Sequence, residues 1–140
     1  MSRDAVHVVE GLFADTAEGP RLLGSRCASC STSYFPRASA CHNPDCDDSK
    51  IEDATFGPRG VLWSCAIQNY APPAPVIWDE PFQPYAVGLV DMPEGLRVLG
   101  RIATGDPMGL KVGGEVELVI EPLATGEDGK PIVSWQFKPL

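Results

Sequence analysis

The fold of this 140-residue chain is decided by two short stretches, Cys27-Ala28-Ser29-Cys30 and Cys41-His42-Asn43-Pro44-Asp45-Cys46. They hold four of the 5 cysteines, arranged as two close pairs. A structural Zn²⁺ takes four ligands in a tetrahedron, and each pair can supply two thiolates from one tight turn. The pattern predicts a structural zinc site whose ligands are Cys27, Cys30, Cys41 and Cys46.

Other interpretations of these cysteines are two disulfides or four unrelated buried thiols. Paired spacings in a chain without an N-terminal secretory signal favour a metal. His42 could replace a thiolate, although neighbouring residues seldom both reach one metal. Iron in place of zinc would give a rubredoxin-like electron carrier. Four protein ligands leave no position for water or substrate, so we expect the metal to hold the fold together and not to catalyse.

The charge of the chain limits its partners. The formal net charge is −8 and the isoelectric point is about 4.6. Nucleic-acid binding depends on Lys and Arg displacing counterions, so this balance disfavours DNA or RNA as the main partner. The sequence has no apolar run of about 18 residues, and we expect a soluble, cytoplasmic protein that does not bind membranes.

The N-terminal residues predict an amphipathic helix over positions 4–18. Apolar side chains recur there at helical intervals, Asp4 can cap the start, and Gly19-Pro20 can end it. A helix with this many apolar side chains must pack on another surface, which is either its own domain or a partner subunit. The sequence does not favour one of these two possibilities over the other.

Short extended runs are expected around the cysteines, at residues 21–26, 33–35 and 51–56. Their alternation with the cysteine pairs is typical of a zinc ribbon. The cluster Gly57-Pro58-Arg59-Gly60 predicts a turn, and we place the boundary between two modules there.

Beyond the turn, strand-like runs recur at residues 61–70, 85–92, 96–103, 115–121 and 132–137. In the first run, alternation predicts an apolar face made of Val61, Trp63, Cys65 and Ile67. Room for a short helix exists between the third and fourth runs, at residues 105–111. Five strands with a helical insert after the third are typical of an OB-fold barrel, the alternative being another small antiparallel sandwich.

The predicted fold class is therefore mainly β, in three parts. Residues 1–20 form an N-terminal helix, residues 21–57 a zinc ribbon, and residues 58–140 a five-stranded OB-fold barrel. Gly88 and Gly100 fit strands that bend sharply to close such a barrel. The 14 Gly and 14 Pro fit short strands joined by turns.

The order of ribbon and barrel resembles a family long catalogued as a domain of unknown function, whose members pair a rubredoxin-like ribbon with an acyl-CoA-associated OB-fold. The resemblance covers nearly the whole chain. The segments that carry it are residues 22–30, 34–37, 41–46, 60–64, 85–91 and 95–102. Two departures concern the ribbon, because Ser31 and Asp47 stand where the family often has Gly. A third is Ala66, where relatives often carry Thr.

The resemblance implies an accessory subunit. Such proteins form complexes with thiolase-fold enzymes, either thiolases acting on aromatic acyl-CoAs or retro-aldolases that shorten steroid side chains. The large partner carries the chemistry, and the small subunit helps to form the acyl-CoA site. The same resemblance makes Cys27, Cys30, Cys41 and Cys46 the zinc ligands.

The remaining side chains agree with a chain that is not catalytic alone. His7 lies on the predicted helix, away from any nucleophile candidate, and Cys65 lies on the apolar face of its strand, as a small buried hydrophobic residue would. We find no Ser/His/Asp set, carboxylate pair or phosphate-binding glycine motif. The alternative function is a nucleic-acid-binding module in which Trp63, Trp78 and Trp135 stack on bases.

Residues 70–84 form a connection too long and too rich in proline for a hairpin turn. It is either a loop folded back on the barrel or, as we prefer, a pre-ordered projection that docks on the partner enzyme. Its apolar side chains are Val76, Ile77, Trp78 and Phe82. Candidates for contact with the partner or the substrate channel are Tyr70, Trp78, Phe82, Arg97 and Arg101. Arginines that could meet CoA phosphates or acidic partner residues are Arg37, Arg59, Arg97 and Arg101.

Overall fold

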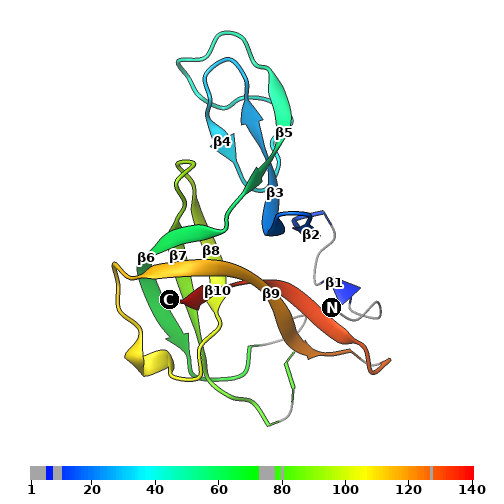
Figure 1. Cartoon of the computed structure of the whole chain (residues 1–140), viewed down its shortest axis with the longest axis vertical. Helices are drawn as coiled ribbons and strands as arrows, with labels where there is room; N and C mark the ends of the chain where they lie inside the picture. Colours follow the sequence, from blue (N-terminus) through cyan, green and yellow to red (C-terminus); the bar gives the residue numbers. More distant parts are fainter. Residues whose placement is uncertain (1–5, 8–10, 73–77, 80, 127) are drawn as a thin grey trace.

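The computed structural model describes residues 6–7, 11–72, 78–79, 81–126 and 128–140, and strands dominate it (Figure 1). A ribbon of residues 13–56 lies at one end of the molecule and a barrel of residues 59–139 at the other. In chain order the elements are β1 (Val6–His7), β2 (Phe13–Thr16), β3 (Gly19–Cys27), β4 (Ser33–Tyr34), β5 (Ile51–Phe56), β6 (Arg59–Gln68), β7 (Tyr85–Asp91), β8 (Arg97–Ile102), the 3₁₀ helix η1 (Pro107–Gly109), β9 (Glu115–Thr125) and β10 (Pro131–Pro139). Within this part of the chain, no helix is long and apolar enough to cross a membrane.

The barrel closes through five pairings. Strand β6 pairs with β7, β7 with β8, β8 with β10, β10 with β9, and β9 returns to β6. All are antiparallel except β8 with β10, which run parallel. Helix η1 lies between the third and fourth barrel strands. This closed order confirms the predicted OB-fold in place of an open sandwich.

The ribbon is built on β3, which pairs along one edge with β2 and then β4, and along the other edge with β5. The runs predicted at residues 21–26, 33–35 and 51–56 thus all contribute strands. Between β5 and β6 only Gly57 and Pro58 remain, because Arg59 and Gly60 already pair with β9.

The predicted N-terminal helix is wrong. Where described, residues 4–18 hold strands β1 and β2, and β1 pairs in parallel with the edge of β10. Gly11 has a φ of 85°, outside the helical region, and Gly19 begins β3 after a two-residue turn. Valines at positions 6, 8 and 9 are β-branched and favour strands, so an apolar spacing that fits a helix gave way to long-range pairing.

The predicted apolar face of the first barrel strand is also wrong in part. A register shift between Leu62 and Ser64 breaks the alternation of β6. Leu62 is buried in the core, whereas Val61 and Trp63 are exposed. Beyond the shift, Cys65 packs against the core, half-buried.

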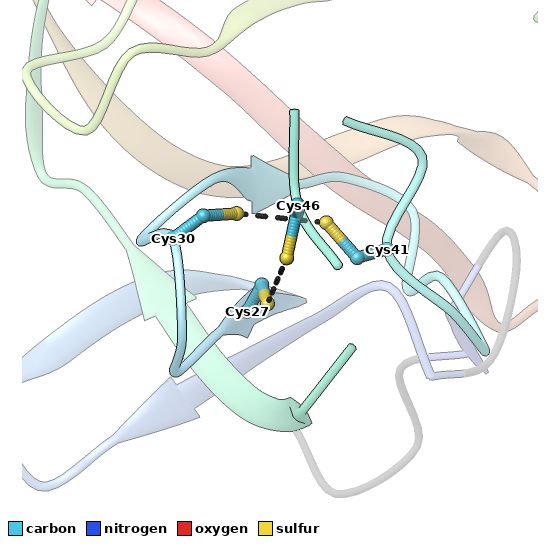
Figure 2. Close-up of side chains that lie close together, drawn as sticks. All are labelled: Cys27, Cys30, Cys41 and Cys46. Carbon is cyan, nitrogen blue, oxygen red and sulfur yellow. Dashed lines mark hydrogen bonds between the residues drawn. The ribbon is translucent and has the colours of Figure 1, made fainter. Parts of the chain in front are cut away.

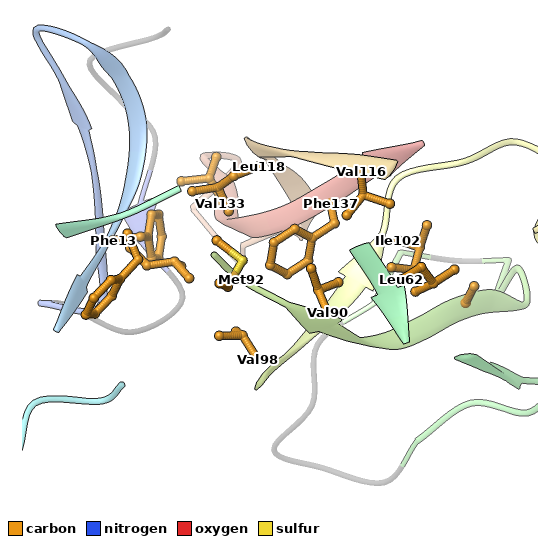
Figure 3. Close-up of a cluster of buried hydrophobic side chains, with 13 residues drawn as sticks. Phe13, Leu62, Val90, Met92, Val98, Ile102, Val116, Leu118, Val133 and Phe137 are labelled. Atoms are coloured by element: carbon orange, nitrogen blue, oxygen red, sulfur yellow. The ribbon is translucent and has the colours of Figure 1, made fainter. Parts of the chain in front are cut away.

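Ribbon and barrel share one hydrophobic core (Figure 3). Phe13, Leu22 and Phe56 from the ribbon belong to the same buried cluster as the barrel residues. Trp135 of β10 lies at the junction, with its ring centre 5.9 Å from that of Phe13 and 5.6 Å from that of Phe35. The aromatic contacts fix the ribbon on the barrel.

Candidate functional site

The first cysteine pair occupies the turn between β3 and β4. Cys27 is the last residue of β3, and its carbonyl accepts a hydrogen bond from the Ser31 N–H at 2.7 Å. The Cys27 N–H donates to the Thr32 carbonyl at 2.9 Å. Ser31 has a φ of 65°, in the left-handed region that Gly would adopt without strain, and among the residues described it is the one non-glycine with positive φ. Ser31 therefore adopts the left-handed conformation that the resemblance associates with Gly at this position, whereas Asp47 does not have a positive φ.

The second pair is ordered by Asn43. The Asn43 carbonyl accepts from the Cys46 N–H at 3.0 Å, and its side-chain oxygen accepts from the Asp45 N–H at 3.0 Å. Its amide nitrogen donates to Thr32 Oγ1 at 3.3 Å, which joins the two cysteine turns. The Cys41 N–H donates to Ser49 Oγ at 2.9 Å. Local polar side chains thus shape this turn.

The four predicted ligands converge on one point (Figure 2). The Sγ atoms of Cys27 and Cys46 are 3.8 Å apart, those of Cys30 and Cys41 are 3.5 Å apart, and all four lie within 4.8 Å of one another. A tetrahedron with Zn–S bonds of about 2.3 Å has sulfur-to-sulfur edges of about 3.8 Å. The sulfur positions and the thiolate chemistry both fit a zinc ion, as predicted.

The thiols differ in acidity. Hydrogen bonding from the backbone of Lys50, and next from that of Cys30, lowers the pKa of Cys27 to about 6. At Cys46 a backbone hydrogen bond from Asp48 lowers the pKa, but burial and the neighbouring thiols outweigh it and raise that pKa to about 12. Four thiolates this close repel one another, so a divalent cation must displace the remaining protons when it binds.

Two hydroxyl groups hold the sulfurs from outside. The Tyr34 hydroxyl lies 3.2 Å from Cys41 Sγ and accepts a hydrogen bond from the His42 N–H at 2.8 Å. The hydrogen bond to Cys41 raises the pKa of Tyr34, so the phenol keeps its proton. Thr32 Oγ1 lies 3.1 Å from Cys30 Sγ, and this hydrogen bond lowers the pKa of Cys30.

The alternative ligand His42 is not part of the cluster of potential metal ligands. Its ring packs edge-on against Tyr34, with centres 5.7 Å apart. In the part of the chain that the structure covers, the metal-ligand cluster consists of the four cysteines.

Three of the predicted contact residues, Trp78, Phe82 and Arg101, lie in a row beside the barrel, and Tyr85 lies between Phe82 and Arg101. The ring centre of Trp78 is 5.6 Å from that of Phe82, and Phe82 is 6.0 Å from Tyr85 of β7. The Tyr85 ring in turn lies 3.9 Å from the Arg101 guanidinium. Trp78 and Phe82 are half-buried and anchor their end of the connection, whereas Tyr70 is 75% exposed. Val76 and Ile77 lie outside the described residues.

Arg97 belongs to a different surface, which the sequence analysis did not identify. Its guanidinium lies 3.6 Å from the centre of the Trp63 ring and is bonded to Asp91 at 2.6 and 3.3 Å. The neighbouring apolar side chains Val61, Trp63 and Leu99 are 42%, 47% and 59% exposed. We call Val61, Trp63, Arg97 and Leu99 the outer patch. The sequence does contain a signal for this exposed surface, namely three successive apolar residues at positions 61–63. Because successive side chains in a strand point to opposite faces, these three cannot all point into the core.

Comparison with known proteins finds a family model for the zinc ribbon and another for the barrel. The family model for the ChsH2 rubredoxin-like zinc ribbon domain matches residues 17–52, and the model for the ChsH2 C-terminal OB-fold domain matches residues 54–121. A DUF35 domain-containing scaffold protein of Methanothermobacter thermautotrophicus is 33% identical over 120 residues, covering 84% of this chain and 86% of the relative.

Two further relatives carry names of enzyme complexes. The benzoylsuccinyl-CoA thiolase subunit BbsA of Thauera aromatica is 31% identical over 121 residues, covering 86% of this chain and 78% of BbsA. A solved chain of the Ltp2-ChsH2(DUF35) aldolase superposes with a TM-score of 0.64 at 25% identity, covering 85% of this chain and 84% of that one. The chain therefore belongs to the ChsH2 (DUF35) family, in which a rubredoxin-like zinc ribbon precedes an OB-fold domain.

Proposed function

We propose that this chain is a non-catalytic subunit that binds a thiolase-fold enzyme and helps to form the acyl-CoA site of that enzyme. The observation that carries the proposal is the 31% identity to a benzoylsuccinyl-CoA thiolase subunit over 86% of this chain. The likeness to a chain of an aldolase complex supports the same role. By analogy with these relatives, the partner is a thiolase or a retro-aldolase acting on an aromatic or steroid side-chain acyl-CoA.

The zinc site supports a structural role for the metal. All four tetrahedral positions are supplied by cysteine, so the ion offers no open position at which to polarise a substrate. The metal holds two turns of the ribbon, and the ribbon packs on the barrel through Trp135. Because the site needs four reduced thiols, we place the protein in the cytoplasm.

The outer patch is our candidate for the surface that meets the partner. Three large apolar side chains share one face of β6 and β8, and stable subunit interfaces bury such groups. The Arg97 guanidinium stacked on Trp63 adds a pair of residue types that often dominate interface energies. Tyr70, on the connection after β6, is a further candidate because it is largely exposed.

Co-expression tests the proposal. The tagged chain is produced together with a candidate thiolase-fold protein from the same genome, and we expect a complex that survives size-exclusion chromatography and cleaves acyl-CoA substrates. The chain alone should show no turnover. Cleavage by the isolated chain, or failure to bind any thiolase-fold partner, would refute the accessory role.

Matched surface variants locate the interface. The double variant Trp63→Ala/Leu99→Ser should lose the partner while keeping its zinc. The control is Met108→Ser, which removes an apolar side chain on η1 that is 82% exposed, more than Trp63 or Leu99. Equal loss of the complex in both variants would argue against the outer patch. A gel shift with single-stranded oligonucleotides should be negative, given the net charge of −8.

A further inference from the structure

A hollow of about 360 Å³ adjoins the outer patch and shares Val61 with it, and we call it the Val61 hollow. It lies where the end of β7 and the turn after it come next to the first residues of β6 and β9. Met92 in that turn is buried and belongs to the hydrophobic core, so the hollow gives access to core surface. Room of this size beside apolar groups suits an apolar side chain of another molecule. The residues that line the hollow include Arg59, Val61, Asp91, Met92, Pro93 and Glu115.

The two arginines nearest to the Val61 hollow are both neutralised by carboxylates. Arg59 Nη1 lies 3.6 Å from Glu115 Oε2, and Arg97 Nε lies 2.6 Å from Asp91 Oδ1. Asp91 lines the hollow while the Arg97 guanidinium lies over the Trp63 ring, so this ion pair connects the hollow with the outer patch. An anion in the hollow would have to compete with these carboxylates for its cation. The paired charges therefore favour an uncharged occupant.

Beyond these two ion pairs, the charge around the Val61 hollow is negative. Glu117 lies directly across from Arg59 in the ladder of β6 and β9, and directly opposite residues share one face of a sheet. Glu94 follows Pro93 in the turn after β7 and is exposed. In the part of the chain that the structure describes, neither carboxylate lies within 4.0 Å of a Lys or Arg nitrogen. A partner segment that complements this surface carries a Lys or Arg beside its apolar side chain.

We propose that the Val61 hollow receives an apolar side chain of the thiolase-fold partner, and that a neighbouring Lys or Arg of that partner meets Glu117 and Glu94. This inference rests on the proposed function and adds the chemistry of the partner segment. The apolar side chain covers Met92 and the exposed side of Val61, and the rest of the outer patch surrounds it. Apolar anchors in pockets supply much of the energy of an interface, whereas charges at its rim mainly set the association rate.

The test measures binding of the full zinc-loaded chain to its thiolase-fold partner by surface plasmon resonance. Val61 is exposed, so a charged side chain there can remain in water without entering the core. Val61→Glu and Val61→Lys should both weaken the complex by about tenfold or more, because a charge of either sign opposes an apolar side chain. A charged occupant would instead be weakened by one variant and strengthened by the other. Met108→Glu and Met108→Lys, on η1, are the matched controls and should bind normally.

The acidic rim is tested through the association rate. The double variant Glu94→Gln/Glu117→Gln should slow association by about threefold at low salt and make the rate less sensitive to added salt. Glu18→Gln is the control, because this exposed glutamate lies in the turn between β2 and β3 of the ribbon. Its association rate should equal that of wild type. Zinc content and circular dichroism verify folding of every variant.

A methionine-methyl NMR spectrum locates the occupant independently of any change at Val61. In the wild-type complex the Met92 methyl signal, assigned by its loss in Met92→Leu, should shift, because the apolar side chain lies against it. The Met108 signal should stay in place. A wild-type complex with an unmoved Met92 signal, or one that Val61→Glu and Val61→Lys leave intact or change in opposite directions, would overturn this inference and leave the proposed function standing. Absence of any complex with wild type would refute both.

Discussion

Tyr34 shows how a single hydroxyl serves the zinc site at the scale of one residue. It reaches Cys41 Sγ and also receives the His42 N–H, so it fixes a ligand and the residue after it. Groups of this kind orient metal ligands without touching the ion, and they tune affinity. Ser31 acts at the same scale, through its backbone conformation.

Replacing Tyr34 with Phe should weaken zinc binding by about 10- to 100-fold, because the ring is kept and the hydrogen bond to Cys41 is lost. Competition with a chelator measures the affinity. Tyr70→Phe is the matched control, since this tyrosine is 75% exposed and lies outside the site. Equal affinities for the two variants would show that the hydroxyl contributes nothing.

Replacing Ser31 with Gly should raise the free energy of unfolding of the zinc-loaded protein by about 0.5–1 kcal/mol, because Gly adopts a φ of 65° without strain. Denaturant titration gives the value. Asp47→Gly is the comparison and should bring no gain, since Asp47 does not have a positive φ. A destabilised Ser31→Gly protein would contradict the strain argument.

At the scale of the element, β7 and β8 meet through Gly88 and Gly100, which pair directly across the two strands. A Cβ at Gly88 would lie 2.7 Å from Leu62 Cδ1, and one at Gly100 would lie 2.7 Å from Phe137 Cε2. These distances are shorter than van der Waals contact, so core side chains occupy the space that a larger residue would need. Because Gly88 and Gly100 have no side chain, Leu62 and Phe137 in the barrel interior can pack directly against the backbone of β7 and β8.

Gly100→Ala should therefore destabilise the protein by about 1–3 kcal/mol through overpacking against the Phe137 ring. Thermal and denaturant unfolding of the zinc-loaded protein measure the change. Gly105→Ala is the control, because a Cβ there meets no atom within 4 Å and its φ is not positive. Similar stabilities for both variants would argue against a filled barrel interior.

At the scale of the whole molecule, ribbon and barrel are joined by a common core, with Trp135 between Phe13 and Phe35. The Trp135 indole N–H also donates to the Leu99 carbonyl at 3.2 Å, which connects the junction to the outer patch. A change in the ribbon can thus reach the surface that we assign to the partner.

Removing zinc with a chelator should lower the melting temperature and shift the NMR signal of the Trp135 indole N–H, because the ribbon loses the ion that holds its turns and no longer fixes Phe35 on Trp135. The indole signal of Trp63, on the outer face of the barrel, should stay in place. Cys30→Ser should reproduce the zinc loss, whereas Cys65→Ser should keep the metal, since Cys65 is outside the cluster. An unmoved Trp135 signal in the metal-free protein would show that the junction does not depend on the ribbon turns.

The features that could be predicted from the amino-acid sequence are those that depend on near neighbours in the chain. The spacing of Cys27, Cys30, Cys41 and Cys46 was enough for the zinc site, because ligands a few residues apart share one turn. The barrel could be predicted from five extended runs and from the short helical insert after the third of them. Strand length and turn residues are local properties of the sequence.

Which faces are buried and which charges are paired depends on contacts that form only in the folded protein. The apolar N-terminal residues fit the pattern of a helix, but β1 and β2 pair with distant strands, and the register shift in β6 places Trp63 and Cys65 in different environments, one exposed and one against the core. Arg97 and Arg101 are alike in sequence context, yet Asp91 pairs with the first and an aromatic ring faces the second. Such outcomes depend on contacts between residues far apart in the chain, and no local pattern carries that information.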